Sequence, residues 1–416
     1  MKPFKLHIIF FSLSLIALVV GCVEPFEAKT ASFENALVIN ALLTTEQKLH
    51  TVKLSRAFRF EEENSIAETS AQVVISDDIG TLYQFNETEP GLYTSTTVFG
   101  ATQGRTYRLN IALADGRSYN SERIICPENT PIIDLKAQRE LNDFGEEGVS
   151  IRLDNSSNES SYFRFEYEET YKVIAPKYDP FEFEVIDYIA CDGNFYEVGL
   201  KQRVQDLSIC YGSAVSTELI QASTVNLEAN KVENFKIRFI GRDNYIMTHR
   251  YSLLVKQFTQ TQDAYSYYQQ LGNFSSSENI FSQIQPGFLY GNIKSETDQD
   301  EKVLGYFEVA SVNERRVYFN YADLFPDEDL PPFPVNCETV SNPQLITRGY
   351  HCDGMGNCDG SCESPLIEGI LAGIIVFAAV NENVTADTPG PYLTLPSPCG
   401  DCSKLGSNIV PDFWEE

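Results

Sequence analysis

A dense group of thiols, an imidazole and carboxylates lies between residues 351 and 362. Zinc binds cysteine and histidine side chains, whereas calcium binds carboxylate and amide oxygens. The segment therefore suggests one of these metals or a knot of disulfides. The residues that carry the three alternatives are His351, Cys352, Asp353, Asn357, Cys358, Asp359 and Cys362.

The spacing of this segment favours disulfides over both metals. The pattern C-x5-C-x3-C does not match a common zinc module. Met355 and Cys358 stand where an EF-hand loop needs an oxygen donor and a glycine. Thiols of an exported protein are normally oxidised. We therefore expect a disulfide knot first, a calcium site second and a zinc site last, and no other cofactor. The weak candidates for calcium ligands are Asp353, Asn357 and Asp359.

The beginning of the sequence predicts an exported protein with a lipid anchor. Lys2 and Lys5 precede an apolar run that is shorter than the about 20 residues of a membrane span. The run ends in Leu18-Val19-Val20-Gly21-Cys22, which resembles a bacterial lipobox, where the signal is cut before a cysteine that then carries fatty acyl chains such as palmitate. An ordinary secretory signal with a chance cysteine is the alternative. The expected parts are a signal peptide at residues 1–21, a lipidated Cys22 and a tether at residues 22–34.

The other cysteines support an oxidising compartment. Ten cysteines occur, and removing the anchor leaves nine, so at least one is expected to stay free. Cys126 lies in an apolar run without a cysteine nearby and is the expected free, buried thiol. The other eight are expected to form four disulfides, with Cys191–Cys210 and Cys399–Cys402 as favoured local pairs. Three connectivities stay open for the remaining four, which are Cys337, Cys352, Cys358 and Cys362.

The composition excludes nucleic-acid binding and shows no common enzyme signature. The 416 residues include 31 Lys+Arg and 59 Asp+Glu, a formal net charge of −28, without a cluster of basic residues to contact phosphates. The motifs HExxH, GxSxG, GxxxxGKS/T and GxGxxG are absent from the sequence, so we expect a protein that is not an enzyme. Three acidic runs could bind cations or a basic partner but are expected to be solvated loop tips, at residues 61–63, 296–301 and 327–329.

Alternation of apolar and polar residues predicts a mainly β chain. Short alternating runs fill residues 36–111, and turn signals such as Pro90-Gly91 and Asp115-Gly116 separate them. Strands of this length and spacing are typical of an Ig-like or prealbumin-like β-sandwich, which we place at residues 35–130. A second β-rich domain with a short helix and a disulfide-rich C-terminal region is expected at residues 131–416.

One helix is expected inside the second domain. Thr261 is a suitable N-cap, and Gly272 is expected to end the helix. Tyr265 and Tyr268 share one face and suggest a platform for sugar rings, but such spacing more often indicates core packing. The strands of this domain are expected at residues 149–153, 162–167, 235–240, 251–258, 303–311 and 316–321.

The C-terminal region contains a second apolar segment and an aromatic end. Residues 366–380 are too few for a membrane span, so we expect a helix that Ser364 caps, with Pro365 in its first turn, followed by a buried strand. Large aromatic side chains at Phe413 and Trp414 predict that the tail folds back onto the second domain. The alternative is a plug for a partner. We therefore separate a cysteine-rich loop at residues 337–362 from a C-terminal cap at residues 399–416.

A series of short motifs follows one order along the chain. The series is Cys22-Val23-Glu24-Pro25, Leu37-Val38-Ile39, Gly91-x-Tyr93, Gly104-x-x-Tyr107-x-Leu109, Tyr251-Ser252-Leu253-Leu254-Val255, Gly291-Asn292-Ile293, Gly305-Tyr306-Phe307 and Cys399-Gly400-Asp401-Cys402. This order resembles the lipoprotein family catalogued as domain of unknown function 4249. The resemblance implies an outer-membrane lipoprotein of Bacteroidota-type bacteria, often encoded beside a TonB-dependent receptor. The family has no assigned biochemistry, so the resemblance implies no catalytic residue.

We therefore expect a lipid-anchored outer-membrane protein, on the cell-surface face rather than the periplasmic face. It would act as an accessory or substrate-capturing protein of a TonB-dependent transporter, its expected partner. Two alternatives stay open. One is a cell-surface enzyme acting on glycans with two carboxylates about 5 to 10 Å apart. The other is a purely structural surface lipoprotein.

Overall fold

A computed structural model describes residues 36–57, 66–159, 161–189, 196–276, 289–338, 340–345, 364–385 and 389–416. Within these residues the protein is mainly β with a few short helices, which confirms the predicted fold class. No described helix is long and apolar enough to cross a membrane. Several predicted features lie outside the described residues: the signal peptide, the tether with Cys22, the acidic run at residues 61–63, and Cys191, Cys352, Asp353, Asn357, Cys358, Asp359 and Cys362.

The first part of the chain forms a β-sandwich-like unit, named here the first sandwich. Alternate residues of β1 (Leu37–Thr44), including Leu37 and Ile39, point into its core. Gly91 and Gly116 have positive φ in the turns that the sequence predicted. The other strands are β2 (Thr51–Arg56), β3 (Ile66–Ala67), β4 (Gln72–Asp77), β5 (Leu82–Glu89), β6 (Leu92–Ser95), β7 (Thr106–Ala112), β8 (Ser118–Ser121), β9 (Ile124–Ile125) and β19 (Ile293–Ser295).

The rest of the chain contributes two packed layers, named here the second sandwich. One layer has the strand order β10–β11–β17, and the other has the order β15–β12–β18–β20 with β16 beside β12. Phe163 and Phe165 of β12 share a buried core with Val149 and Ile151 of β11. The bounds are β10 (Ile132–Leu141), β11 (Glu147–Asn155), β12 (Tyr162–Ile174), β15 (Ile209–Val215), β16 (Ile220–Ser223), β17 (Phe235–Gly241), β18 (Arg250–Gln260), η1 (Tyr245–Met247) and α3 (Tyr321–Leu324).

One long strand, β20 (Val303–Asn320), belongs to both sandwiches. Its first half pairs in parallel with β1, and its second half pairs in antiparallel fashion with β18. The prediction of two separate strands here is wrong. The polar residues 313–315 read as a break in the alternation, but they continue the ladder, with Glu314 opposite Lys256. Gly305 has a φ of +102°, and a Cβ there would lie 1.8 Å from the carbonyl oxygen of Ile39, so glycine is required where β1 approaches.

Helix α2 (Gln262–Ser276) lies against the second sandwich. The hydroxyl of Thr261 accepts a hydrogen bond from the Ala264 amide at 3.3 Å, which confirms the predicted N-cap. The prediction that Gly272 ends the helix is wrong, because the helix runs on to Ser276. A Cβ at Gly272 would lie 2.9 Å from a methyl group of Leu219. This glycine therefore permits close packing of helix and loop and does not stop the helix.

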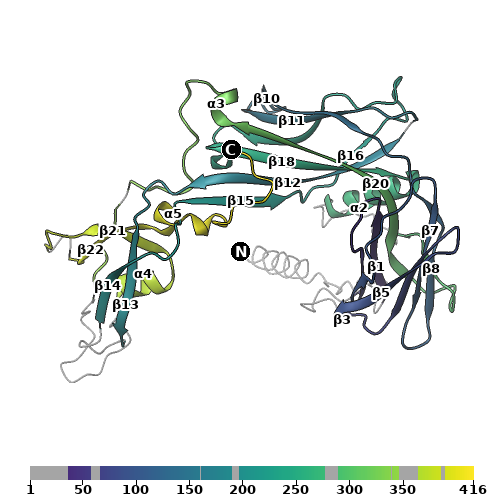
Figure 1. Cartoon of the computed structure of the whole chain (residues 1–416), viewed down its shortest axis with the longest axis horizontal. Helices are drawn as coiled ribbons and strands as arrows, with labels where there is room; N and C mark the ends of the chain where they lie inside the picture. The colour runs from purple at the N-terminus through teal and green to yellow at the C-terminus, as the bar shows by residue number, and fades with distance from the viewer. Residues whose placement is uncertain are drawn as a thin grey trace, which may run out of the picture.

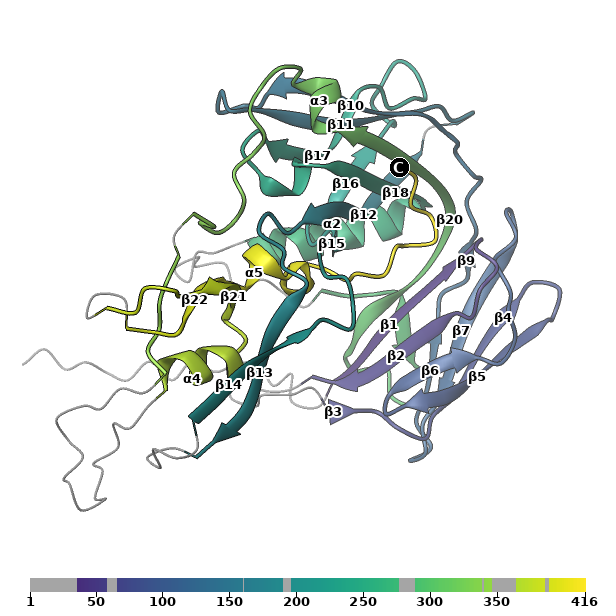
Figure 2. The same cartoon turned by 60° about the vertical axis from the view of Figure 1, so that its left-hand side comes forward.

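The last elements of the chain and one earlier hairpin form a separate projection, named here the C-terminal limb. As predicted, the Ser364 side chain caps α4, Pro365 stands in the first turn, and a strand follows. The limb consists of β13 (Phe181–Tyr188), β14 (Tyr196–Gln202), α4 (Pro365–Leu371), β21 (Ile375–Val380), β22 (Tyr392–Pro396), α5 (Ser397–Gly400) and η2 (Cys402–Lys404). In Figures 1 and 2 the first sandwich and the limb both descend from the second sandwich, on its right and left sides.

Two disulfides fix the junction between the limb and the second sandwich. Cys402 bonds Cys210 of β15, and Cys399 bonds Cys337, with Cα–Cα distances of 5.5 and 5.6 Å. The predicted pairing of Cys399 with Cys402 is wrong, and Cys210 does not bond Cys191. The prediction that Cys337 pairs within the group of Cys337, Cys352, Cys358 and Cys362 is also wrong, because Cys337 bonds Cys399. Nearness in sequence favoured the local pairs, but the tertiary fold brings each cysteine of this short segment to a different distant partner. Cys126 is free and buried, as predicted.

Candidate functional site

A cavity of about 600 Å³ opens on one face of the second sandwich. This face, named here the underside, is the side of the β15–β12–β18–β20 layer that is turned away from β11. Strands β12 and β18 form the floor of the cavity, residues 215–219 form a wall, and Tyr268 of α2 closes one end. Ligand pockets commonly enclose about 300 to 1,000 Å³, so the cavity has the size of a binding site.

The strand period explains which side chains reach the cavity. Along β12, Phe163 and Phe165 belong to the buried core, whereas the alternate residues Arg164, Glu166 and Glu168 line the cavity. The same alternation in β18 places Leu254 and Lys256 on the floor. The site therefore consists of the charged face of β12, whose opposite face is buried in the core.

Arg164 is the most buried cation of the site, since only 8% of its side chain is exposed. Its guanidinium lies 3.2 Å from the carboxylate of Glu308 and 4.2 Å from the ring centre of Phe258. A buried cation needs such a partner, and an aromatic face adds a cation–π contact. Gln260 donates a hydrogen bond to Glu308 at 2.6 Å. Burial alone would lower the pKa of Arg164, but Glu308 and Glu166 more than offset this and raise it.

The exposed charges at the mouth of the cavity are mostly negative. Glu166, Glu168 and Glu218 line the cavity and are exposed. Lys256 also lines the cavity, but its ammonium group lies 2.9 Å from Glu46 outside the cavity. Because Glu308 and Glu166 pair with Arg164, and Glu46 pairs with Lys256, the other two carboxylates, Glu168 and Glu218, dominate the local potential at the mouth.

The pKa shifts in the site keep its cations protonated and its tyrosine neutral at pH 7. Burial raises the pKa of Tyr268 well above its usual value, so its phenol stays neutral. Burial would lower the pKa of Lys256, but its hydrogen bond and ion pair with Glu46 raise it. Every described carboxyl group with a shifted pKa has it lowered: Glu46, Asp77, Glu87, Asp115, Glu140, Asp206 and Glu416.

The C-terminal tail covers the other end of the underside. Trp414 packs edge to face on Tyr211 with ring centres 4.9 Å apart, and the guanidinium of Arg316 lies 3.6 Å from the ring centre of Phe413. Lys172 forms an ion pair with Glu416 at 2.9 Å. The prediction that the tail folds back onto the second domain is therefore confirmed. The cavity lies between this tail and α2, on an otherwise occupied face.

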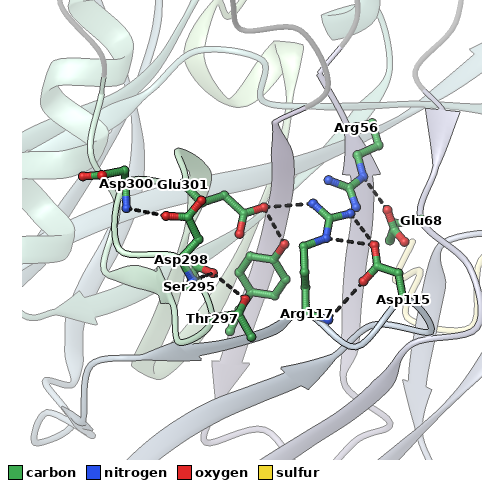
Figure 3. Close-up of polar contacts among 10 residues, drawn as sticks. Arg56, Glu68, Asp115, Arg117, Ser295, Thr297, Asp298, Asp300 and Glu301 are labelled. Carbon is green, nitrogen blue, oxygen red and sulfur yellow. Dashed lines mark hydrogen bonds and ion pairs between the residues drawn. The ribbon is translucent and has the colours of Figure 1, made fainter.

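A second polar cluster lies in the first sandwich (Figure 3). Glu301 accepts hydrogen bonds from the guanidinium of Arg117 at 3.0 Å and from the hydroxyl of Tyr119 at 2.7 Å. Arg117 also binds Asp115 at 2.6 Å, and these contacts raise the pKa of its guanidinium. The expectation that the acidic run at residues 296–301 is only a solvated loop tip is wrong at Glu301, which holds its loop against β8.

In the third acidic run, Asp327 and Asp329 are exposed, as predicted, but Glu328 is paired. Glu328 contacts Arg139 at 2.7 Å and Arg242 at 3.4 Å. Among the described residues, no group of three or more histidine, cysteine, aspartate or glutamate side chains is arranged to hold a metal ion. The predicted calcium ligands of the cysteine-rich loop lie outside those residues and stay predictions.

Sequence reasoning did not find the cavity. One local signal is the arginine flanked by phenylalanines in Phe163-Arg164-Phe165, because a strand places it on the face opposite two apolar rings. Another is Tyr268, which lines the cavity although its helical spacing favoured core packing. Phe258 and Glu308, the partners of Arg164, come from distant strands. The predicted disulfide cysteines that the structure describes, Cys210, Cys337, Cys399 and Cys402, lie at the base of the limb and not in the cavity.

Comparisons with known proteins identify a family without naming a reaction. The model of the family "Domain of unknown function (DUF4249)" matches residues 23–316. No curated protein matches the sequence. One similar solved structure is a DUF4785 family protein from Legionella pneumophila subsp. pneumophila str. Philadelphia 1, with 8% identity and a TM-score of 0.19 over 54% of this chain. The chain spans about half of that protein, 52% of its length. By the match over residues 23–316, the chain belongs to the DUF4249 family.

Proposed function

We propose that this protein is a lipid-anchored outer-membrane protein that captures a ligand at the cell surface for an associated TonB-dependent transporter. The observation that carries the binding role is the cavity of about 600 Å³ on the underside. Its lining combines apolar side chains, such as Leu254 and Tyr268, with a few charged groups at fixed positions, which is the usual composition of a ligand site.

The anchoring part of the proposal rests on the lipobox-like sequence that ends at Cys22. Cys22→Ala removes the acceptor thiol and leaves the folded part unchanged. Metabolic labelling with a fatty acid should mark the wild-type protein and leave the variant unlabelled. Equal labelling of both proteins, or of neither, would contradict a lipid at this position.

The surface position is tested by protease treatment of intact cells. Loss of the full-length protein from the outer membrane, with periplasmic markers intact, is the expected result. Protection from the protease would place the protein on the periplasmic face and remove nutrient capture from its role.

The association with a transporter is tested by purification from native membranes in a gentle detergent. A β-barrel receptor should co-purify with the wild-type protein, and Cys22→Ala serves as the control for anchoring. Recovery of the wild-type protein alone, at yields where other membrane complexes survive, would contradict the proposal.

A further inference from the structure

The wall of the cavity begins at an open edge of the large sheet. Strand β15 is the last strand of its sheet, so one of its edges faces outward. The tail uses part of that edge: Tyr211 donates a backbone hydrogen bond to Ser407 at 2.8 Å and accepts one back at 3.0 Å. Because backbone groups alternate in direction along a strand, Ser213 and Val215 face the same way as Tyr211. No described residue pairs with the edge at these two positions.

The open part of this edge carries no charged residue, proline or bulge. Exposed strand edges normally carry charges, prolines or bulges that prevent pairing with another chain. Residues 213–215 read Ser-Ala-Val and are exposed, and their pairing with β12 is regular. Extended peptides bind such edges by adding a strand, with main-chain hydrogen bonds for affinity and side-chain pockets for specificity.

The edge and the cavity lie side by side. Val215 stands opposite Glu168 in the ladder between β15 and β12, and both line the cavity. Every second side chain of an added strand would therefore point to the underside, toward Glu168 and Glu218. Those exposed carboxylates complement basic side chains, and Leu219 offers apolar contact to the stem of a lysine or arginine.

The size of the surface decides which kind of polypeptide fits. A stable protein partner buries about 800 Å² on each side. Two free edge residues and one cavity are too small for that, but they suit a short ligand. We propose that the cavity and the β15 edge capture short, extended peptides with basic side chains. This inference rests on the proposed capture role and names its substrate class.

The test uses the full-length lipoprotein in detergent and a fluorescein-labelled peptide, Thr-Lys-Thr-Lys-Thr-Lys-Thr, read by fluorescence anisotropy. The expected result is saturable binding that weakens as salt rises from about 0.05 to 0.5 M. The same peptide with glutamate in place of lysine should bind at least about tenfold more weakly. Equal binding of the two peptides would overturn the proposal.

Two further comparisons separate the cavity and the edge from general charge attraction. Glu168→Gln/Glu218→Gln should weaken binding about tenfold, whereas Asp78→Asn/Glu89→Gln, an equal charge change on the exposed surface of the first sandwich, should leave it unchanged. In an antiparallel strand added to β15, the residues that point to the underside also turn their amides toward β15. A lysine peptide N-methylated at its lysine amides therefore cannot pair with the edge and should bind at least about fivefold more weakly. Equal effects of the two double variants, or unchanged binding of the methylated peptide, would overturn the proposal.

Purification of the receptor from native membranes distinguishes the failure of peptide capture from the failure of the transporter role. A receptor that co-purifies with wild-type protein and with Glu168→Gln/Glu218→Gln, while the wild-type protein binds no lysine peptide, overturns the peptide inference alone. Peptide binding without a receptor overturns the transporter role alone. Loss of the receptor only in Glu168→Gln/Glu218→Gln would assign the cavity to the partner and overturn the peptide inference.

Discussion

The Arg164 guanidinium lies 3.2 Å from the Glu308 carboxylate beneath α2, and 8% and 0% of the two side chains are exposed. Glu308 belongs to β20, the strand that both sandwiches share, and Arg164 belongs to β12. The pair therefore links the floor of the cavity to the junction of the two sandwiches.

Breaking this pair should destabilise the protein strongly. Glu308→Gln removes the buried carboxylate and leaves the guanidinium with only the exposed Glu166 as an ionic partner, and breaking a buried pair costs up to about 3 to 5 kcal/mol. Urea denaturation should show this loss, while Lys294→Ala, which breaks an exposed pair with Glu122, should cost less than about 1 kcal/mol. Arg164→Met/Glu308→Met should recover much of the loss, because both charges are gone. A double variant less stable than Glu308→Gln would contradict this explanation.

The disulfide connectivity is open to direct mapping. Digestion without reduction should release one cross-linked peptide pair that contains Cys210 and Cys402 and another that contains Cys337 and Cys399. Mass spectrometry identifies both. A peptide with an internal bond between Cys399 and Cys402 would contradict the structure.

The free thiol should be inert in the folded protein. Burial raises the pKa of Cys126 to about 11, so at pH 8 only about one molecule in a thousand carries the reactive thiolate. A thiol reagent should leave Cys126 unmodified in buffer and modify it fully in denaturant. Rapid modification of the folded protein, located at Cys126 by mass spectrometry, would show that the site is open.

The aromatic tail should stabilise the isolated protein. Trp414→Ala removes the ring that packs on Tyr211, and the partial exposure of this residue suggests a loss of about 1 to 3 kcal/mol. Thermal melting measures the effect, and Asp412→Ala, at an exposed tail residue, is the control. Unchanged stability together with loss of receptor co-purification would instead assign the tail to a partner.

The stabilisation of the folded state by the Glu46 carboxylate should decrease as the pH falls. Burial alone would raise its pKa, but hydrogen bonds from Lys48 and Lys256 lower it from 4.5 to about 2. A carboxyl with a lowered pKa stabilises the folded state above its unfolded pKa, and this contribution is lost as pH falls through the folded pKa. The stability difference between wild type and Glu46→Gln should be constant above about pH 5, shrink between about pH 5 and pH 2, and vanish only below about pH 2. A difference that grows on acidification would contradict this assignment.

Features set by local sequence could be predicted, and features set by long-range pairing could not. The alternation of Leu37 and Ile39, the turn at Gly116 and the Ser364 cap each depend on a few neighbouring residues, and each appears in the structure. The cavity needs the register of β12, β18 and α2 together, which no local pattern encodes. Gly272 shows the same limit, since its contact with Leu219 overrides the local signal for a helix end.

An experiment in intact cells tests most directly whether this protein captures a ligand for an associated transporter at the cell surface. Amine-reactive cross-linking of living cells, followed by purification of this protein and mass spectrometry, reports its neighbours before any detergent is added. We expect cross-links from its exposed lysines to a β-barrel receptor in wild-type cells, and none in cells that carry Cys22→Ala. Cross-links only within this protein, at normal surface abundance, would contradict the account.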